Sequence, residues 1–137
     1  MTDQCEEPLP DRVRHAIAEF NAGQYFEQHE TLEAVWRAEP RPIRELYRGI
    51  LQIGLACYQV QHANGVGAIK MLDRAQRWLQ PFRPACQGVE VDRLLADAER
   101  LRSEIDRLGF NRLDRIDRSL FPIVHLLTSD EHKSTSC

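Results

Sequence analysis

The feature that most constrains the fold is an apolar run in the middle of the chain. Between Gly49 and Tyr58 the sequence reads GILQIGLACY, and Gln52 is the one polar side chain that interrupts the run. A helix that is apolar almost all round is buried on most of its sides. We therefore expect a buried central helix over residues 42–63, with the other elements packed around it.

Proline, glycine and asparagine residues predict where the remaining elements begin and end. The expected helices cover residues 11–22, 24–38, 65–79 and 91–108, with a short extra helix over 114–120. No strand pattern is visible, so the sequence predicts an all-α fold, a single compact bundle of five main helices around the central one. The predicted domain spans residues 11–127, and residues 1–10 and 128–137 are expected to be flexible ends.

Composition narrows the class of protein. The chain has 137 residues, 42% hydrophobic and 28% charged, which is the size and balance of one globular domain. A formal charge of −3 gives no electrostatic reason to expect a nucleic-acid or membrane partner. No apolar run reaches about 18 residues, and the acidic N-terminus is unlike a secretory signal, so we expect a cytoplasmic protein.

The four cysteines lie far apart, and no CxxC pair occurs among them. This spacing argues against a disulfide framework and against a zinc ribbon. Cys57 falls in the apolar run and is expected in the core, while Cys5 and Cys137 lie in the polar ends. No His or Asn arrangement points to a cysteine nucleophile, so chemistry is expected from histidine and carboxylate groups.

The second predicted helix carries an imidazole and a carboxylate on its apolar face. On a helical wheel, His29 and Glu33 lie on the side that the helix turns to the core. That side is completed by Tyr25, Leu32 and Trp36. The positions predicted to point away are Glu27, Gln28 and Thr31.

The central helix carries a matching polar stripe. Arg48, Gln52 and Gln59 fall within about 40° of one direction at 100° per residue. A hairpin that reverses near Pro40 would place Glu33 opposite Arg48 and His29 opposite Gln52. We therefore expect a polar pocket between the second and third helices. Its predicted lining residues are Tyr25, Trp36, Arg48, Gln52 and Gln59.

The segment from His29 to Glu33 has the form H-E-x-x-E, which allows a metal site. Residues i and i+4 share a helix face, so His29 and Glu33 would be metal ligands, with Glu30 as general base on a metal-bound water. Catalytic zinc takes three protein ligands. One histidine with carboxylates suits Mn or Fe(II) at least as well as Zn. Candidates for a further ligand are Gln59, His62, Asp114 and Asp117.

Two other interpretations of the same cluster stay open. In one, the cluster is a buried hydrogen-bonded network that only fixes helix register; its members are His29, Glu33, Arg48 and Gln52. In the other, a non-catalytic module binds a small molecule or a partner protein, with Tyr25 and Trp36 as walls and Arg48 as an anion clamp. The apolar stripe of the fifth helix would also allow a homo-oligomer.

The stretch Phe20–Trp36, FNAGQYFEQHETLEAVW, resembles the signature F-N-x-G-x-Y…H-E-x-L-E-x-x-W of the family called domain of unknown function 309. A second block also fits, and its residues are Tyr47, Gly49, Ile50, Gln52, Ala56, Asn64, Gly67 and Ala68. The resemblance covers about Phe20 to Leu79. It implies a compact α-helical bundle, and members are sometimes labelled predicted metal-dependent hydrolases. Together with the H-E-x-x-E motif, this makes a metal-dependent hydrolase the leading functional hypothesis, with the non-catalytic binding module as the alternative. Where many members carry a histidine near the end of the third helix, this chain has Gln59, with His62 one turn later.

Overall fold

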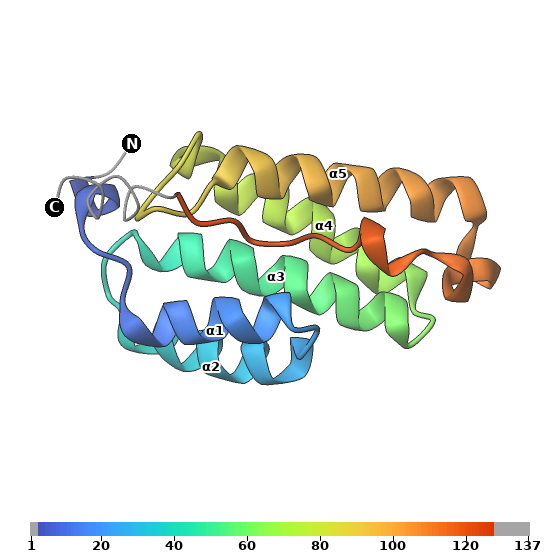
Figure 1. Ribbon diagram of the computed structural model, residues 1–137, viewed down its shortest axis with the longest axis horizontal. Coiled ribbons are helices and arrows are strands. Elements are labelled where there is room, and N and C mark those ends of the chain that lie inside the picture. Colours follow the sequence, from blue (N-terminus) through green and yellow to red (C-terminus); the bar gives the residue numbers. More distant parts are fainter. Residues whose placement is uncertain (1–2, 128–137) are drawn as a thin grey trace, which may run out of the picture.

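The computed structural model describes residues 3–127, which form an all-α fold (Figure 1). The predicted fold class is confirmed, while the predicted end over 128–137 lies outside the described residues. The five α-helices are α1 (Asp11–Asn21), α2 (Tyr25–Ala38), α3 (Arg44–Gln61), α4 (Gly65–Leu79) and α5 (Val91–Leu108). The 3₁₀ segments are η1 (Asp3–Glu6), η2 (Gln80–Phe82), η3 (Phe110–Arg115) and η4 (Arg118–Leu120). None of the helices within residues 3–127 is long and apolar enough to cross a membrane.

The helix ends follow the local chemistry of the sequence. Gly23 and Gly109 follow α1 and α5 with φ of +80° and +82°, a region of backbone space that favours glycine. The Asn64 side chain caps α4 by accepting a hydrogen bond from the Gly67 N–H at 2.9 Å. The short helix expected over 114–120 is instead two 3₁₀ segments, because the buried Ile116 between them has an extended backbone.

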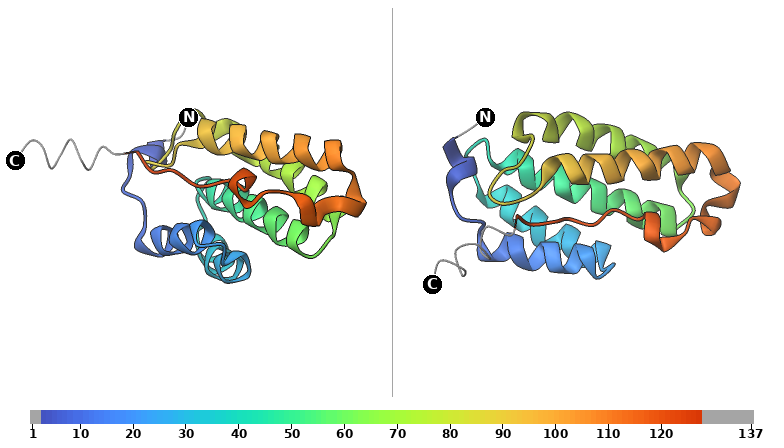
Figure 2. Two further views of the ribbon diagram at one scale, coloured as in Figure 1. Left: turned by 45° about the vertical axis from the view of Figure 1, so that its right-hand side comes forward. Right: turned by 45° about the horizontal axis from the view of Figure 1, so that its top comes forward.

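Helices α2, α3 and α4 lie side by side, with α3 packed against both of the others. Helix α1 packs on α2, and α5 packs on α4 (Figure 1). The segment after η4 runs between α1 and α5 and covers one side of α3 (Figure 2). Asn21 holds this segment through two hydrogen bonds of 2.9 Å to the backbone of Val124. One side of α3 is therefore covered by α1, α5 and the C-terminal segment.

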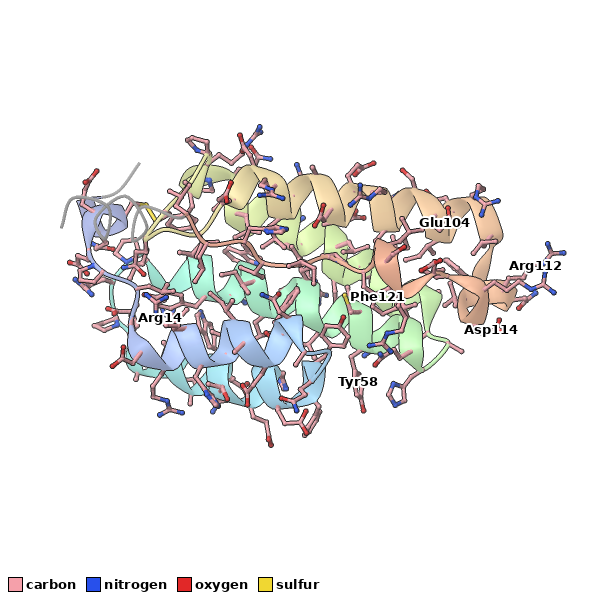
Figure 3. The ribbon with its side chains drawn as sticks, in the orientation of Figure 1. Arg14, Tyr58, Glu104, Arg112, Asp114 and Phe121 are labelled. Atoms are coloured by element: carbon pink, nitrogen blue, oxygen red, sulfur yellow. A yellow bond between two sulfur atoms is a disulfide. The ribbon has the colours of Figure 1, made fainter. Side chains whose placement is uncertain are left out.

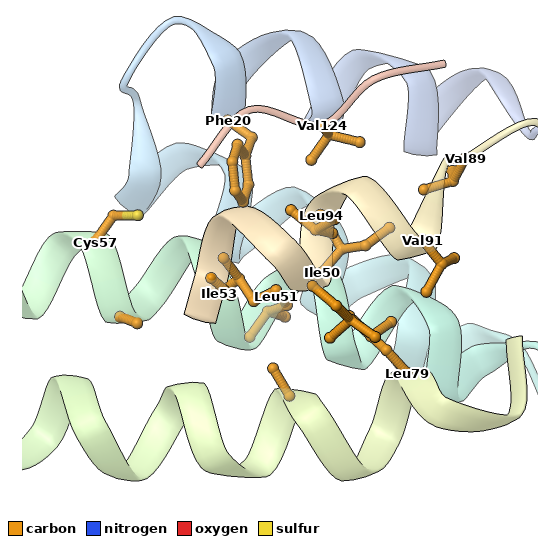
Figure 4. Close-up of a cluster of buried hydrophobic side chains, with 14 of the residues drawn as sticks. Phe20, Ile50, Leu51, Ile53, Cys57, Leu79, Val89, Val91, Leu94 and Val124 are labelled. Atoms are coloured by element: carbon orange, nitrogen blue, oxygen red, sulfur yellow. The ribbon is translucent and has the colours of Figure 1, made fainter. Parts of the chain in front are cut away.

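The core is built around the apolar run of α3 (Figure 4). Ten of the helix's residues are buried: Leu46, Tyr47, Gly49, Ile50, Leu51, Ile53, Gly54, Ala56, Cys57 and Val60. Two of these are glycines at close helix contacts. A Cβ atom added at Gly49 would overlap the side chain of Leu79 on α4, and one added at Gly54 would overlap the side chain of Gln28 on α2. Both neighbouring helices thus approach α3 more closely than an alanine there would allow.

The N-terminal segment is tied to the bundle by a disulfide between Cys5 and Cys86, whose Cα atoms are 4.4 Å apart. The expectation that the cysteines do not pair is therefore wrong for these two, because their 81-residue separation is bridged only by the folded chain. The Cys5 carbonyl also accepts a hydrogen bond from the Gln87 N–H at 2.9 Å. The Gln4 side chain accepts one from the Ile43 N–H at 2.9 Å. Residues 4 and 5, assigned to a flexible end on sequence alone, are thus held in place.

Tyr47 connects this attachment to the core. Its hydroxyl donates a hydrogen bond of 2.8 Å to the buried Gln87 side chain, whose amide in turn donates to the Gln4 carbonyl at 3.1 Å. Burial raises the pKa of Tyr47 to about 12, so the hydroxyl stays a donor at any ordinary pH.

Reduction of the disulfide is expected to destabilise the fold. A cross-link over 81 residues lowers the entropy of the unfolded chain, so its loss should reduce the free energy of unfolding by up to about 4.5 kcal/mol. Urea denaturation with and without dithiothreitol measures this effect. The Cys5→Ser variant should not respond to the reductant, whereas Cys57→Ala, which keeps the disulfide, should respond. An unchanged midpoint in the native chain, after mass spectrometry has verified reduction, would contradict the expectation.

Candidate functional site

The H-E-x-x-E residues lie on the surface of α2 rather than in its core-facing stripe. The His29 Nε2 and Glu33 Oε1 atoms are 3.8 Å apart, and the two side chains are 26% and 37% exposed. The other Glu33 carboxylate oxygen accepts a hydrogen bond of 3.1 Å from Arg37. Glu30, the predicted base, is exposed. The spacing therefore brings His29 and Glu33 together as predicted, at the edge of the helix packing.

A metal at this position would have two protein donors, His29 and Glu33. Among the described residues, no three His, Cys, Asp or Glu side chains come together. His62, a predicted further ligand, stacks on Tyr58 with ring centroids 4.1 Å apart, and its Nδ1 lies 2.9 Å from the Tyr58 carbonyl. Gln59 accepts a hydrogen bond of 2.9 Å from Asn64. The donor set thus falls one short of the three that catalytic zinc takes.

Neither Asp114 nor Asp117 joins His29 and Glu33 in a cluster of metal-ligating side chains among the described residues. Asp114 is exposed at the end of the molecule beyond α3, away from α2 (Figure 3). Asp117 accepts a hydrogen bond of 2.8 Å from the Ser119 N–H and caps η4, which lowers the pKa of its carboxyl. Both residues belong to the local structure of the segment after α5.

Contacts between α2 and α3 follow the antiparallel register that the hairpin predicts. Trp36 contacts Arg44 and Arg48, and Phe26 contacts Tyr58 with ring centroids 6.0 Å apart. This register sets Glu33 across from Arg48 and His29 across from Gln52. Which side of α2 faces α3, however, differs from the prediction.

Gln28 lies in the contact between α2 and α3 and is completely buried, so the prediction that it points away is wrong. Its Nε2 donates a long hydrogen bond of 3.4 Å to the Leu51 carbonyl, and its Oε1 has no partner among the described residues. The buried positions of α2 are Tyr25, Gln28 and Leu32, at helical spacing. The sequence signal was Gly54, because a glycine inside an apolar helix marks a close approach by a neighbour.

Tyr25, a predicted pocket wall, belongs to the core. It packs edge-on against Phe20 with ring centroids 5.7 Å apart, and it also contacts Phe121. Burial raises the pKa of its hydroxyl, and the neighbouring Cys57 thiol adds to the shift. Burial likewise raises the pKa of Cys57 to about 12, which leaves the thiol protonated and unreactive. The cysteine expected in the core is there.

The side of α3 that is turned away from α1 and α5 carries a stripe of half-buried residues. They are Arg48, Gln52, Leu55 and Gln59, spaced by three and four positions. We call this stripe the outer face, together with the residues that lie beside it. These residues are Arg44 and Tyr58 of α3, Phe26, His29 and Trp36 of α2, and Trp78 of α4. The outer face includes the predicted polar stripe, which lies at the surface of the three-helix layer rather than inside the bundle.

Three side chains of the outer face form a stack in which one arginine contacts two tryptophan rings. The Arg48 guanidinium lies 4.0 Å from the ring centroid of Trp78 on α4 and 5.0 Å from that of Trp36 on α2. Arg44 covers Trp36 from 4.3 Å and donates a hydrogen bond of 3.2 Å to its carbonyl, near the C-terminus of α2. Trp78 and Arg44 were not among the predicted site residues, since the contact depends on how α4 packs.

Several buried polar atoms along this face have no hydrogen-bond partner among the described residues. They include His29 Nδ1, Trp36 Nε1 and Gln52 Oε1. Such atoms ordinarily bond to protein or to ordered water. His29 and Gln52 therefore do not satisfy one another in the way a closed structural network requires.

The far end of the outer face is aromatic. Phe26 is 48% exposed, and its ring lies 6.0 Å from those of His29 and Tyr58. Tyr58 projects from α3 on the side opposite to α5 (Figure 3). Two hollows found elsewhere, of about 400 and 260 Å³, are lined by other residues than those predicted for the site.

Comparison with known proteins gives a family match and one relative. The family described as Domain of unknown function (DUF309) matches residues 13–71. Over 97 residues, 68% of this chain, the sequence is 32% identical to the uncharacterized protein YpuF of Bacillus subtilis (strain 168). The aligned part is 56% of that protein, so the chain spans a little over half of its length. No solved structure matches the chain.

The contact between Gln28 and Gly54 predicts a change of sign in a double-mutant cycle. Gly54→Ala should destabilise the native chain by about 1–3 kcal/mol through overpacking. In a Gln28→Ala background the added methyl group has room, and alanine's higher helix propensity should make the same change neutral or stabilising, by up to about 1 kcal/mol. Urea denaturation measures each step. Gly49→Ala, which meets Leu79, is the control: its cost should be equal in both backgrounds.

Proposed function

Residues 13–71 belong to the domain of unknown function 309 family, and from this premise we propose that the chain is a non-catalytic binding module. Its site is the outer face, where Arg48 binds a carboxylate group of the ligand. The carrying observation is the position of the Arg48 guanidinium between two indole rings.

Contact with the two tryptophan rings holds the Arg48 side chain in place before an anion binds. Contact with both rings restricts the rotamers of Arg48, so less side-chain entropy is lost when a ligand binds. The side chain is still 34% exposed, which leaves N–H donors for an in-plane carboxylate. Its protein ion pair is weak, since Nη1 is 3.5 Å from the Glu45 carboxylate, longer than an ordinary hydrogen bond.

The surroundings of Arg48 match the composition of binding surfaces. Tryptophan, tyrosine and arginine are the residue types that dominate binding energy at protein interfaces. Trp36, Trp78 and Arg44 lie beside Arg48, and Tyr58 lies ten residues further along α3.

Intrinsic fluorescence tests the anion site. The chain has two tryptophans and both flank Arg48, so the emission reports on this site. Glutarate should change the emission in a saturable way. Arg48→Met should weaken its binding by about tenfold or more, the value of a hydrogen bond to a charged group. Arg100→Met, an exposed change on α5, should leave binding unaltered. No saturable change, or one that survives Arg48→Met, would disprove the site.

A metal-dependent hydrolase is the second candidate, favoured by the His29 and Glu33 pair at 3.8 Å on one helix face. In this proposal His29 and Glu33 would hold a divalent Zn, Mn or Fe ion, which would supply Lewis-acid activation of a water, and Glu30 would be the general base. Elemental analysis of protein purified without a metal-affinity tag is expected to find stoichiometric metal that His29→Ala removes. Metal that is sub-stoichiometric or independent of His29 would eliminate this candidate.

The location in the cytoplasm and the absence of nucleic-acid or membrane partners are proposals from composition. The Cys5–Cys86 disulfide weighs against the cytoplasm, where thiols are mostly kept reduced.

A further inference from the structure

We infer that the partner of the outer face is an acidic amphipathic helix of another protein, which lies along α3 between α2 and α4. This inference rests on the proposed function, because it takes Arg48 as the anchor for one acidic side chain of the partner. It adds the identity of the ligand as a helical protein segment.

The first argument is length. Arg48 and Tyr58 are ten residues apart on α3, which corresponds to about 15 Å along the helix axis. A small carboxylate bound to Arg48 would contact only that end of the outer face. Phe26, at the other end, remains 48% exposed and stacks beside Tyr58. An occupant that contacts both ends must be an extended segment of chain.

The second argument is the nature of the surface between these ends. Leu55, one turn beyond Gln52, is a half-buried apolar side chain that packs on the core. An apolar contact between the two aromatic ends suits the i, i+4, i+7 spacing of an amphipathic helix. The described residues of the bundle contain no strand whose edge an extended peptide could join. A helix can instead align with α3 at one of the ordinary helix-packing angles.

The third argument is charge. At the tryptophan end, Arg44 and Arg48 lie near the carboxylates of Glu45 and Glu33, and Glu33 is already paired with Arg37 at 3.1 Å. This end therefore favours acidic side chains, and it also favours the negative C-terminal end of a helix dipole. At the Phe26 end the described contacts are aromatic, with His29 and His62 beside them. The partner helix should thus carry its glutamates toward its C-terminus and its apolar residues toward its N-terminus.

Designed peptides test the inference. The probe is a 16-residue peptide, about 24 Å long as a helix, with leucines on one face and two glutamates in its last turn. One control has the same composition with the leucines scattered around the helix, and another replaces the glutamates by lysines. Tryptophan fluorescence gives the affinity of each peptide, and circular dichroism gives its helix content on binding. The probe should bind at least tenfold more tightly than either control.

A variant at the far end of the face separates this inference from the anion site. Phe26→Ala should weaken binding of the probe at least fivefold and leave glutarate binding unchanged. The control is Ile123→Ala, in the C-terminal segment that covers the other side of α3, and it should alter the binding of neither ligand. Suppose that glutarate binds, but the probe binds no more tightly than its controls or its affinity is unchanged by Phe26→Ala. The inference of a helical partner is then wrong, and the anion site stands. If neither ligand binds, both proposals fail.

Discussion

The architecture depends on two close contacts of α3, at Gly49 and Gly54. Each glycine lacks the atom that would otherwise hold a neighbouring helix away, so Leu79 of α4 and Gln28 of α2 reach the α3 backbone. The two positions differ by five residues, about 140° around the helix at 100° per residue. The contacts are therefore on different sides of α3, and they bring α2 and α4 close to α3 on its two sides.

This constraint also produces the candidate site. Trp36 comes from α2 and Trp78 from α4, and both reach the same guanidinium of α3. One arginine can contact a ring from each neighbouring helix only if the helices on its two sides are close enough for their side chains to reach it. The covered side of α3 contributes stability through apolar burial, and the opposite side contributes an arrangement of polar and aromatic groups. One helix thus organises both the core and the surface available for binding.

The sequence predicted the fold better than it predicted the site, for a physical reason. Helix ends at Gly23 and Gly109 follow from local backbone chemistry, and the apolar run of α3 follows from burial, so both are visible in the sequence. The predicted pairing of α2 with α3 along their lengths was right, but the predicted core-facing side of α2 was one residue off. A wide apolar sector on a helical wheel does not fix how the helix is rotated about its own axis. Only the approach of Gly54 decides that Gln28, and not His29, points inward. Trp78 and the pairing of Cys5 with Cys86 depend on contacts between distant segments, which no local pattern encodes.

The disulfide has a topological consequence. The bond between Cys5 and Cys86 closes the chain into a covalent ring that contains α1, α2, α3 and α4, and with them the whole family match and the three stacked side chains at Trp36, Arg48 and Trp78. Helix α5 and the C-terminal segment lie outside the ring. A single backbone cut at any loop inside the ring would therefore leave the two fragments covalently joined, whereas a cut after Cys86 would release α5 from everything except its packing.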